Sequence, residues 1–365
     1  MKAKIVIAST LKPVIDPRAY EKMGKSLVAT NLYEVHIIGS KPTIEEDSIF
    51  LHPITTFAKG KSHRILLPWR ILKLIFRLRP TILIINTHEL LLIGVIYKFF
   101  KKAKVIYDIQ ENYYNNIIYQ QNYRWIIRQV LSQYIRIKEV LLAGKIDHFF
   151  IAEKCYSDEL NFIGNRFTII ENKFIAPAKW QKNKDQNKTS FLLSGTISKE
   201  YGVFEAIEFI KHFPVAEYQL VIIGHCANKQ TYTTIKSLVK DLKNVDFLVQ
   251  QTPVKHSEIL AAVGNKTIGL LPYQANKSTE NKIPTKLYEY LGLGIPIIIS
   301  FNKKWDDIIQ KYKAGLSIDF QQPPNTEQIS IINTLINSIQ QIDLKDINWK
   351  IEETKLLASV NSLLK

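Results

Sequence analysis

Short runs of isoleucine, valine and leucine alternate with segments of helical periodicity along almost the whole chain. The runs are apolar at successive positions, as strands are when both faces of a parallel sheet are buried. The segments between them place apolar residues three and four positions apart, which predicts helices. Such an alternation predicts a doubly wound α/β fold, in which helices cover both faces of a parallel sheet.

One polar segment divides the alternation into two series of strands. The first series of predicted strands comprises residues 5–8, 35–38, 82–85, 105–107, 148–151 and 168–170. The second series comprises residues 191–194, 219–223, 245–249, 267–271, 295–299 and 316–318. The residues between the two series are rich in lysine and asparagine and have no hydrophobic period, which is typical of a linker.

These series define the predicted domains. The length of 365 residues exceeds what one hydrophobic core usually supports. We predict an N-terminal Rossmann-like domain over residues 1–178, a linker over 179–190 and a C-terminal Rossmann-like domain over 191–345. Two such domains are expected to face a central cleft, where ligands bind.

The composition is that of an ordered globular protein with an excess of basic residues. Hydrophobic residues make up 46% of the chain, and the formal net charge is +16. A basic surface indicates an anionic partner, such as nucleic acid, anionic lipid or a phosphorylated substrate. Many lysines stand singly, so an ordinary solvated surface explains the charge equally well. The sequence has no zinc-finger spacing, RNP-like signature or dense basic tail, which argues against a nucleic-acid-binding protein.

The cysteines and the apolar runs indicate the compartment. Cys155 and Cys226 are far apart in sequence and form neither a disulfide framework nor a metal-binding spacing, which favours a reducing compartment. The apolar run near the N-terminus is too short for a signal peptide, and no run is long enough to span a bilayer. We expect a cytoplasmic protein, soluble or bound peripherally to the inner face of the plasma membrane.

The segment FLLSGTISKEYGVFEAIEFI, which starts at Phe191, is the first candidate site. A predicted buried strand ends in Gly195 and Thr196, and Gly202 opens a helix after a short polar turn. Glycine allows close backbone approach, and free amides at a helix start favour a phosphate group. Lys199 could add a positive charge to the same phosphate. A plain strand–helix turn that contains glycine is the alternative interpretation.

The segment NKIPTKLYEYLGLGIPIIIS, residues 281–300, is the second candidate site. Pro284 suits the first position of a helix, where its missing N–H is not needed. Lys286 and Glu289 are three positions apart and therefore share one face of that helix. A carboxylate there can accept hydrogen bonds from two ribose hydroxyl groups, while the lysine and the helix-start amides face a diphosphate. An ordinary exposed Lys–Glu pair is the alternative.

Together, the two segments resemble the donor-binding half of the retaining GT-B glycosyltransferases of family 4, the glycosyl transferases group 1. In that family a glycine-containing turn follows the first strand of the C-terminal domain. A later helix carries a glutamate and leads through a G-x-P-V/I turn into a strand. The corresponding residues here are 195–202, Glu289 and 294–297. The resemblance implies a nucleotide-diphosphate sugar as donor substrate, no cofactor and no metal site.

The resemblance extends more loosely to the rest of the chain. Asp16, Pro17 and Arg18 resemble the D-P-R that precedes the first helix in the family. The segment VIYDIQENYY, residues 105–114, resembles the strand end that lines the acceptor side. The helix predicted at 346–365 resembles the C-terminal segment that crosses back to the first domain.

Specific site residues follow from the resemblance. It places Asn281 and Gln110 at catalytic positions. The implied donor-binding residues are Gly195, Thr196, Lys199, Ile283, Thr285, Lys286 and Glu289, and the implied acceptor side includes Asp16, Arg18 and Glu111. A helix cap is an equally good interpretation of Asp16. Base recognition is expected near residues 224–225 and 250–253.

Four positions depart from the family pattern. Asn281 replaces the first member of the family's glutamate pair, and Gln110 replaces the acceptor-side histidine. Thr196 and Tyr201 stand where the family has basic residues, and Lys199 and Lys286 are candidates to compensate. The chain is interpreted as a retaining glycosyltransferase. A catalytically inactive relative that acts as a binding or scaffolding subunit, and another GT-B enzyme such as an epimerase, stay open as alternatives.

Two basic amphipathic segments indicate where the acceptor lies. Residues 64–79 contain Trp69 among arginines and lysine, and residues 123–141 contain Trp125 with Arg124, Arg128, Arg136 and Lys138. Such helices can lie in an anionic membrane interface, although core helices whose basic side chains reach solvent are the alternative. The polar stretch 111–123 is predicted to be a loop, either on the acceptor side or simply at the surface. We favour a glycan or lipid-linked acceptor in the synthesis of a surface polysaccharide or glycoconjugate.

Overall fold

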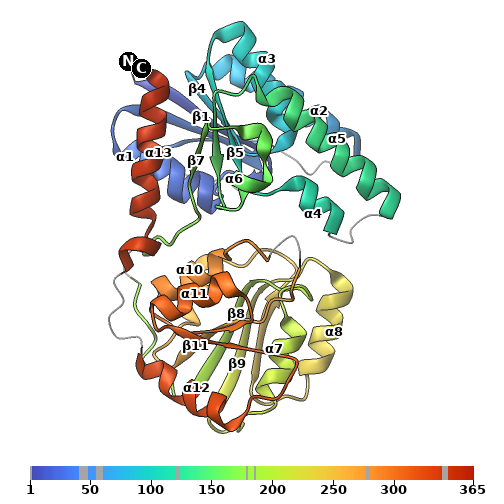
Figure 1. Cartoon of the computed structure of the whole chain (residues 1–365), viewed down its shortest axis with the longest axis vertical. Helices are drawn as coiled ribbons and strands as arrows, with labels where there is room; N and C mark the ends of the chain where they lie inside the picture. Colours follow the sequence, from blue (N-terminus) through green and yellow to red (C-terminus); the bar gives the residue numbers. More distant parts are fainter. Residues whose placement is uncertain are drawn as a thin grey trace. The chain divides into compact units, whose positions relative to one another are not determined.

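The computed structural model describes residues 2–40, 48–54, 61–119, 124–177, 180–184, 186–276, 280–338 and 344–365. The chain divides into two compact units (Figure 1). The N-terminal unit comprises Met1–Asn172 and Trp349–Lys365, and the C-terminal unit comprises Lys173–Asn348. Each unit has a parallel sheet and hydrophobic cores of its own.

The described residues of the N-terminal unit form a seven-stranded parallel sheet in the order β3-β2-β1-β4-β5-β6-β7. Its strands are β1 (Ala3–Pro13), β2 (Tyr33–Ser40), β3 (Phe50–Pro53), β4 (Ile82–Ile85), β5 (Lys104–Ile109), β6 (His148–Ile151) and β7 (Phe167–Ile169). In the register of the sheet, Ile5 of β1 lies between Val35 of β2 and Ile82 of β4. The chain winds outward from β1 in both directions, so the order reverses between β1 and β4.

Helical segments of this unit connect the strands. They are the π-helical η1 (Pro17–Gly24), α1 (Lys25–Ala29), α2 (Lys61–Leu78), η2 (His88–Leu90), α3 (Leu91–Lys101), α4 (Tyr113–Tyr119), α5 (Trp125–Ala143), α6 (Tyr156–Glu159), η3 (Asn161–Ile163) and α13 (Trp349–Leu364). Successive residues of a strand point their side chains to opposite faces of the sheet. Val6 and Leu83 pack with α2 and α3 residues, whereas Ile5 and Ile82 pack with η1 and α13 residues.

The described residues of the C-terminal unit form a six-stranded parallel sheet in the order β10-β9-β8-β11-β12-β13. Its strands are β8 (Thr189–Thr196), β9 (Tyr218–His225), β10 (Val245–Gln250), β11 (Thr267–Leu271), β12 (Ile297–Ser300) and β13 (Gly315–Ile318). Its helices are α7 (Val203–Ile210), α8 (Lys229–Val239), α9 (His256–Ala261), α10 (Thr285–Gly292), α11 (Lys303–Lys311), α12 (Thr326–Ser338) and η4 (Leu344–Ile347).

Helices cover both faces of this second sheet. Phe191 and Leu193 pack with α7 and α12 residues, and the intervening Leu192 packs with α9 and α10 residues. This alternation explains why the strands are apolar at successive positions. The prediction of two parallel-sheet α/β units is confirmed.

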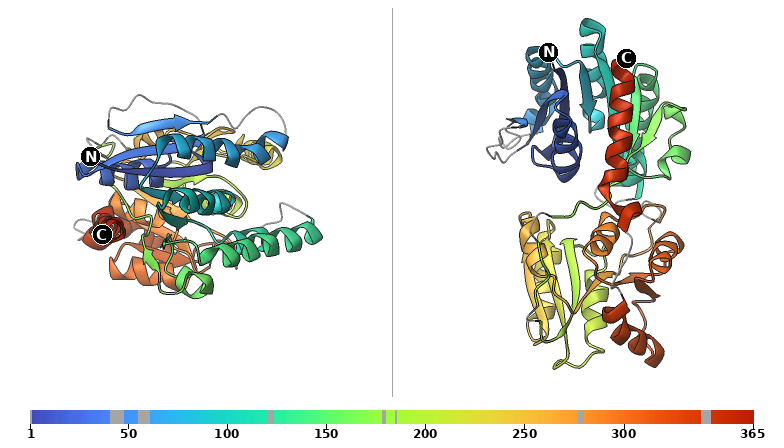
Figure 2. Two further views of the ribbon diagram at one scale, coloured as in Figure 1. Left: turned by 90° about the horizontal axis from the view of Figure 1, so that it is seen from above. Right: turned by 90° about the vertical axis from the view of Figure 1, so that its left-hand side faces the viewer.

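Helix α13 belongs to the N-terminal unit, although it follows the whole C-terminal unit in sequence (Figure 2). It packs against η1, α1 and β7. Trp349 Nε1 donates to Ser26 Oγ at 2.9 Å, and Glu352 Oε2 accepts from the Glu171 amide at 3.1 Å. Leu356 and Val360 are fully buried.

Three local predictions differ from the structure. Residues 113–119 of the predicted loop 111–123 form α4, whose side chains are only partly buried, and residues 120–123 lie outside the described residues. The edge strand β3 was not predicted, since it is short and Phe50 is half exposed. Helix α2 begins at Lys61, three residues before the predicted segment 64–79, and contains Pro68.

The segment predicted as the linker runs along the C-terminal unit where it is described. Trp180 Nε1 donates to the Leu260 carbonyl at 3.0 Å, and the Asn183 amide donates to the Val263 carbonyl at 3.0 Å. Strand β8 begins at Thr189, inside the predicted range. Among the described helices, none has both the length and the apolarity that a membrane crossing requires.

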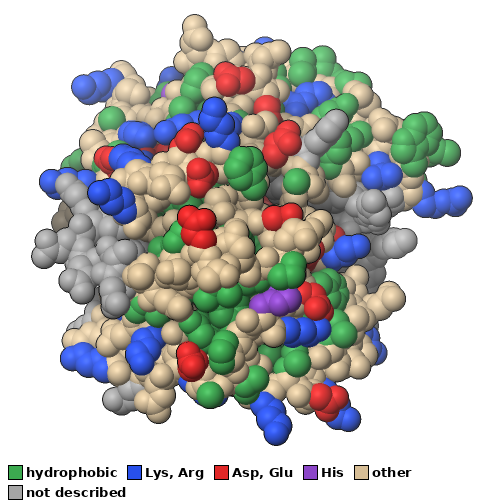
Figure 3. Space-filling view, turned by 60° about the horizontal axis from the view of Figure 1, so that its bottom comes forward, with side chains coloured by type: hydrophobic (Ala, Val, Ile, Leu, Met, Phe, Trp, Pro, Cys, Tyr) green, Lys and Arg blue, Asp and Glu red, His purple; other side chains and the backbone are tan. Residues whose placement is uncertain are grey.

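The net positive charge is distributed rather than concentrated on the face shown in Figure 3. The described Lys and Arg side chains of that face are spread among acidic ones instead of forming one patch. This distribution fits an ordinary solvated surface better than a nucleic-acid interface there.

The packing of α13 gives a testable prediction. Leu356→Ala removes a fully buried side chain and should lower the free energy of unfolding of the N-terminal unit by about 2–5 kcal/mol, because a cavity remains. Ile351 lies on the exposed side of the same helix, so Ile351→Ala should cost less than about 1 kcal/mol. Urea denaturation of both variants checks the difference, and equal losses would contradict this packing.

Candidate functional site

The strand order of the C-terminal sheet reverses between β8 and β11. In doubly wound sheets, ligands bind outside the carboxyl ends of the strands at this reversal. Strand β8 ends there at Gly195 and Thr196, and β11 is followed by Pro272 and Tyr273. The sequence-predicted phosphate turn therefore lies at the topologically favoured place.

Glycine is required at two positions of this turn. Gly195 has φ +104°, and a Cβ atom there would lie 3.0 Å from Cε of Lys286. Gly202 has φ +73°, and its Cβ would lie 1.8 Å from the Pro272 carbonyl oxygen. Both backbone conformations are rare for residues with a side chain. The glycines thus let the turn, the end of β11 and the Lys286 side chain approach one another closely.

Lys286 and Glu289 meet on α10, as the sequence predicts for two residues three positions apart. Lys286 Nζ lies 2.9 Å from Glu289 Oε2 and 3.0 Å from Oε1. His256, the first residue of α9, places Nε2 3.1 Å from Glu289 Oε1. His256 comes from a distant part of the sequence and was not predicted. The only sequence signal was its place after the predicted strand 245–249.

The surroundings of Glu289 keep its carboxylate ionised. Burial raises the pKa of this carboxyl, but the hydrogen bonds from His256 and Lys286 and the charge of Lys286 outweigh it. The net effect lowers the pKa from 4.5 to about 2. A negative carboxylate at this place is a strong acceptor for hydroxyl groups.

Helix α10 is fixed to β8 through Tyr290. Its hydroxyl lies 3.0 Å from Ser194 Oγ and donates to the Leu192 carbonyl at 3.2 Å. Gly269 of β11 leaves room for the tyrosine ring, since a Cβ there would lie 2.3 Å from it. Tyr290 therefore anchors the part of α10 that carries Glu289 to β8.

The other predicted donor residues belong to the end of β8, the turn after it and the start of α10. Thr196, the last residue of β8, and Lys199, in the turn after it, are exposed. Ile283 is half-buried, and Thr285 begins α10 and is exposed. Pro284 stands one position before the helix instead of at its first position.

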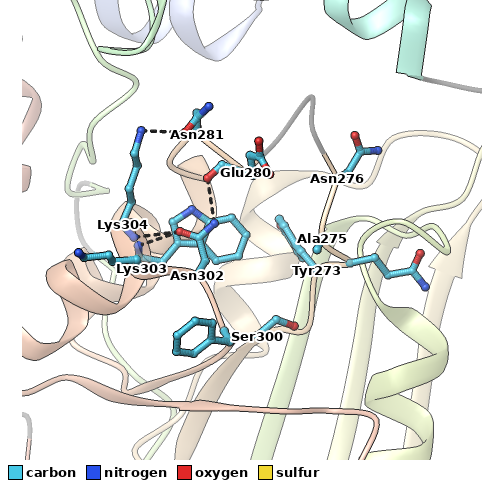
Figure 4. A pocket seen from close by; sticks show the side chains of 12 residues that line it. Tyr273, Ala275, Asn276, Glu280, Asn281, Ser300, Asn302, Lys303 and Lys304 are labelled. Atoms are coloured by element: carbon cyan, nitrogen blue, oxygen red, sulfur yellow. Dashed lines mark hydrogen bonds between the residues drawn. The ribbon is translucent and has the colours of Figure 1, made fainter.

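A pocket of about 340 Å³ lies beside this region, at the ends of β11 and β12 and the start of α11 (Figure 4). Asn281 lines it and accepts a hydrogen bond from Lys304 Nζ at 3.0 Å. Tyr273 lines it as well, with its ring edge-on to Trp305 and 4.7 Å from the ring of Tyr201. Tyr201, which replaces a basic residue of the family pattern, thus packs against the aromatic wall of the pocket.

In the N-terminal unit, Arg18 is buried in an ion pair with Asp108 of β5. Its Nε and NH2 atoms lie 2.6–3.1 Å from the Asp108 carboxylate oxygens. Its NH1 atom donates to the Ile170 carbonyl at 2.7 Å and to Asn172 Oδ1 at 3.0 Å. Arg18 is 3% exposed, so it joins η1, β5 and the end of β7 rather than lying open to solvent.

The remaining predicted acceptor-side residues lie around this ion pair. Asp16 caps η1, because its Oδ1 accepts from the amides of Arg18 and Ala19 at 3.1 and 3.0 Å. Gln110 Nε2 donates to Asp108 Oδ2 at 2.9 Å. Glu111 Oε2 accepts from Asn116 Nδ2 of α4 at 2.8 Å.

A polar cluster that was not predicted lies where the N-terminal sheet reverses its order. Thr10 Oγ1 of β1 lies 3.0 Å from Thr87 Oγ1 after β4 and donates to Glu89 Oε2 at 3.3 Å. Lys138 Nζ of α5 donates to His88 Nδ1 at 2.8 Å. Asn86 is 1% exposed, and within the described chain its Oδ1 and Nδ2 have no hydrogen-bond partner.

No group of three or more His, Cys, Asp or Glu side chains in the described residues is arranged to hold a metal ion. Cys155 and Cys226 are free thiols.

Comparison with known sequences assigns the C-terminal unit. Residues 175–337 match the model of the family Glycosyl transferases group 1. The match lies within the C-terminal unit and spans nearly all of it. No curated protein matches the sequence of the chain.

Comparison with solved structures identifies the fold of the whole chain. Sucrose-phosphate synthase from Thermosynechococcus elongatus matches with a TM-score of 0.71 at 11% identity, over 100% of this chain and 99% of that chain. HepE of Anabaena, in complex with UDP and glucose, matches with a TM-score of 0.67 at 12% identity, over 99% and 100%. The catalytic domain of starch synthase IV from Arabidopsis thaliana, bound to ADP and acarbose, matches with a TM-score of 0.66 at 10% identity, over 100% of both chains. At these identities the likeness shows the fold, which is GT-B.

The environment of Glu289 predicts a pH dependence of stability. A carboxyl whose pKa falls from 4.5 to about 2 on folding stabilises the folded C-terminal unit above pH 4.5, and this contribution is lost as the pH falls through 2. The stability of Glu289→Gln should therefore decrease less than that of the wild type over this range. Urea denaturation at several pH values checks it. Glu208→Gln removes an exposed pair of the same spacing and should leave the slope unchanged.

The Arg18 ion pair gives a second prediction. Arg18→Ala leaves the fully buried Asp108 carboxylate without its main partner and should lower the free energy of unfolding by about 3–5 kcal/mol. Lys25→Ala breaks an exposed ion pair and should cost less than about 1 kcal/mol. An Arg18→Ala protein of unchanged stability in urea would show that Arg18 is not needed for folding and would favour a direct role in binding.

Proposed function

We propose that the protein is a glycosyltransferase that transfers a sugar from a nucleotide-diphosphate sugar to a glycan or lipid-linked acceptor. The observation that carries this proposal is the meeting of the Gly195 turn, Lys286 and the ionised Glu289 at the reversal of the C-terminal sheet. This arrangement lies inside the domain that matches the glycosyl transferases group 1.

The donor would bind through its two charged parts. Glu289 offers carboxylate oxygens to the ribose hydroxyl groups, and Lys286, Lys199 and the amides after Gly195 face the diphosphate. Thr196, Ile283 and Thr285 are further donor-binding residues in this proposal. Residues 224–225 and 250–253 lie at the ends of the adjacent strands β9 and β10, where the register pairs Gln250 with His225, and we assign base recognition to them.

We propose transfer with retention of configuration and without a metal ion. The bond between the sugar and the diphosphate oxygen breaks, the acceptor oxygen bonds to the sugar, and the acceptor proton leaves with the diphosphate. The developing negative charge on the diphosphate would be stabilised by Lys286, Lys199 and helix amides. Asn281 and Gln110 stand at the catalytic positions in this proposal.

Hydroxyl-rich acceptors fit the polar cluster of the N-terminal unit. Thr10, Glu89 and Lys138 offer acceptors and donors in a small space. Asn86 has both side-chain polar atoms unpaired within the described residues. This buried amide leaves hydrogen-bonding capacity unused beside the cluster. We place the reaction in the cytoplasm, at the inner face of the membrane that supplies a lipid-linked acceptor.

A catalytically inactive relative is the second candidate function. The replacement of a glutamate by Asn281 and of a histidine by Gln110 favours it. Such a protein would bind a nucleotide sugar and act as a binding or scaffolding subunit. Donor binding is common to both functions, whereas sugar transfer separates them.

Donor binding is tested by thermal denaturation with UDP, GDP, ADP and their sugar conjugates. A ligand at one hundred times its dissociation constant should stabilise the wild type by about 2.7 kcal/mol. Glu289→Ala should lose this stabilisation, because the ribose hydroxyl groups lose their acceptor. Glu208→Ala is the matched control and should keep it, since that glutamate is exposed and paired with Lys211 at the same spacing.

Release of nucleoside diphosphate in the presence of an acceptor then separates the two functions. Binding with release supports the transferase, and binding without release supports the inactive relative. No stabilisation by any of the nucleotides would contradict both.

A further inference from the structure

Helix α5 exposes apolar side chains along one face, while its other face buries polar groups beside Ile135 and Ala143. Its outward face carries Ile126, Val130, Tyr134, Ile137 and Leu141, which are 67%, 65%, 59%, 55% and 74% exposed. Surface helices normally turn such residues toward the core and their charged residues toward water. Here the side chains that face the unit include Ser132, Arg136 and Glu139, and Glu139 is 3% exposed.

The inward polar residues are held by specific partners. Arg136 NH2 donates to Asn112 Oδ1 at 2.8 Å, and Glu139 Oε1 accepts from the hydroxyl of Tyr107 at 3.0 Å. Arg128 NH1 donates to the carbonyl of Ile118 in α4 at 3.1 Å. Rotating α5 to bury its apolar face would break these bonds. The charged groups would then be exposed or buried without partners. The outward apolar face is therefore the stable arrangement of this helix.

The exposed face is long and continuous. Ile127, Val130, Tyr134, Ile137 and Leu141 follow one another at intervals of three and four positions, so they form one stripe along the helix. Nineteen residues of helix extend about 28 Å. An apolar stripe of this length exposed on a folded protein marks a binding surface.

The charges around the stripe show whether it suits a second copy of this chain or an anionic lipid surface. Glu139 is the single acidic residue of α5 and is buried, while Arg124 and Lys145 stand exposed just beyond its two ends. Lys98 of α3 reaches the Lys145 carbonyl at 2.9 Å, and the following residues of α3 include the exposed Phe99 and Phe100. Lys101, Lys102 and Lys104 follow them and are exposed.

A second copy of the chain would meet this face with the same cations. Helix pairs are usually aligned by opposite charges beside the apolar stripe, and α5 offers no exposed acid for this. An anionic lipid surface supplies both an apolar layer for the stripe and negative charge for the lysines. Trp125 and Tyr134 suit the boundary between headgroups and acyl chains.

We propose that the outward face of α5 is a membrane-docking surface that lies in the interface of an anionic lipid layer. The helix enters the interface with its Ile, Val and Leu side chains, and the flanking lysines and Arg124 contact the lipid headgroups. Under the proposed function, this surface would hold the protein at the membrane in which a lipid-linked acceptor lies. Lipid docking does not depend on sugar transfer, so each can fail without the other.

Vesicle flotation of the full chain tests the proposal. The wild type should bind vesicles of phosphatidylcholine with phosphatidylglycerol and bind those of phosphatidylcholine alone much more weakly. Binding should weaken as the salt concentration rises, because the headgroup attraction is screened. The double substitution Ile137→Gln with Leu141→Gln should reduce the partition coefficient about tenfold or more, since two apolar side chains no longer enter the interface.

Leu238→Gln is the matched control. Leu238 is an exposed leucine on α8 of the C-terminal unit, 47% exposed, and its substitution should leave vesicle binding unchanged. Unchanged thermal denaturation of the α5 variant shows that it is folded, and unchanged transfer to a water-soluble acceptor separates docking from catalysis.

Three results would overturn the proposal. The first is a wild type that does not float with anionic vesicles at low salt. The second is an α5 variant that binds vesicles as well as the Leu238→Gln protein does. The third is a wild type that dimerises in sedimentation equilibrium while the α5 variant stays monomeric, which would assign the face to a second copy of the chain.

Discussion

Burial of both faces of the two parallel sheets determines where this protein can have polar chemistry. Strand residues such as Ile5, Ile82 and Ile222 are fully buried, and their backbone groups are used in the sheet ladders. Free amides and polar side chains can gather only where the strands end. In both sheets the strand order reverses in the middle, so each unit has one place where free amides and polar side chains gather. The Gly195 turn with Lys286 occupies one, and the Thr10–Thr87 pair occupies the other.

The two places differ in charge because different side chains reach them. In the C-terminal unit, burial raises the pKa of Glu289, but the hydrogen bonds from His256 and Lys286 and the charge of Lys286 lower it to about 2. Lys286 has three donors and can hold Glu289 while it faces a phosphate. In the N-terminal unit, burial lowers the pKa of Lys138, although Glu89 and Glu139 oppose this effect. We therefore propose a charged donor site in the C-terminal unit and a hydrogen-bonding acceptor site in the N-terminal unit.

The sequence predicted what depends on local pattern. Continuous apolar runs located nearly every strand, and the spacing of Lys286 and Glu289 predicted their contact. Helix α4 was missed because it is only seven residues long and has two asparagines at its centre, and β3 was missed because a short edge strand leaves little pattern. His256 could not be linked to Glu289, since only the return of the chain through β10 and α9 brings them together. Arg18 was predicted as a site residue, but its burial against Asp108 is a property of the folded unit.

Helix α5 shows how a correct pattern can give the wrong orientation. The sequence identified an amphipathic basic helix and placed its arginines and lysine toward a membrane or solvent. An amphipathic pattern defines two faces without deciding which one is inside. Tyr107 and Asn112 decide it here, because these buried groups near the end of β5 need Glu139 and Arg136 as partners. The apolar face is consequently left outside, and positive charge reaches the same region from other elements, through Lys101, Lys102, Lys104 and Lys145. Hydrophobic insertion and headgroup attraction thus come from separate residues, and each can change without disturbing the buried network that orients the helix.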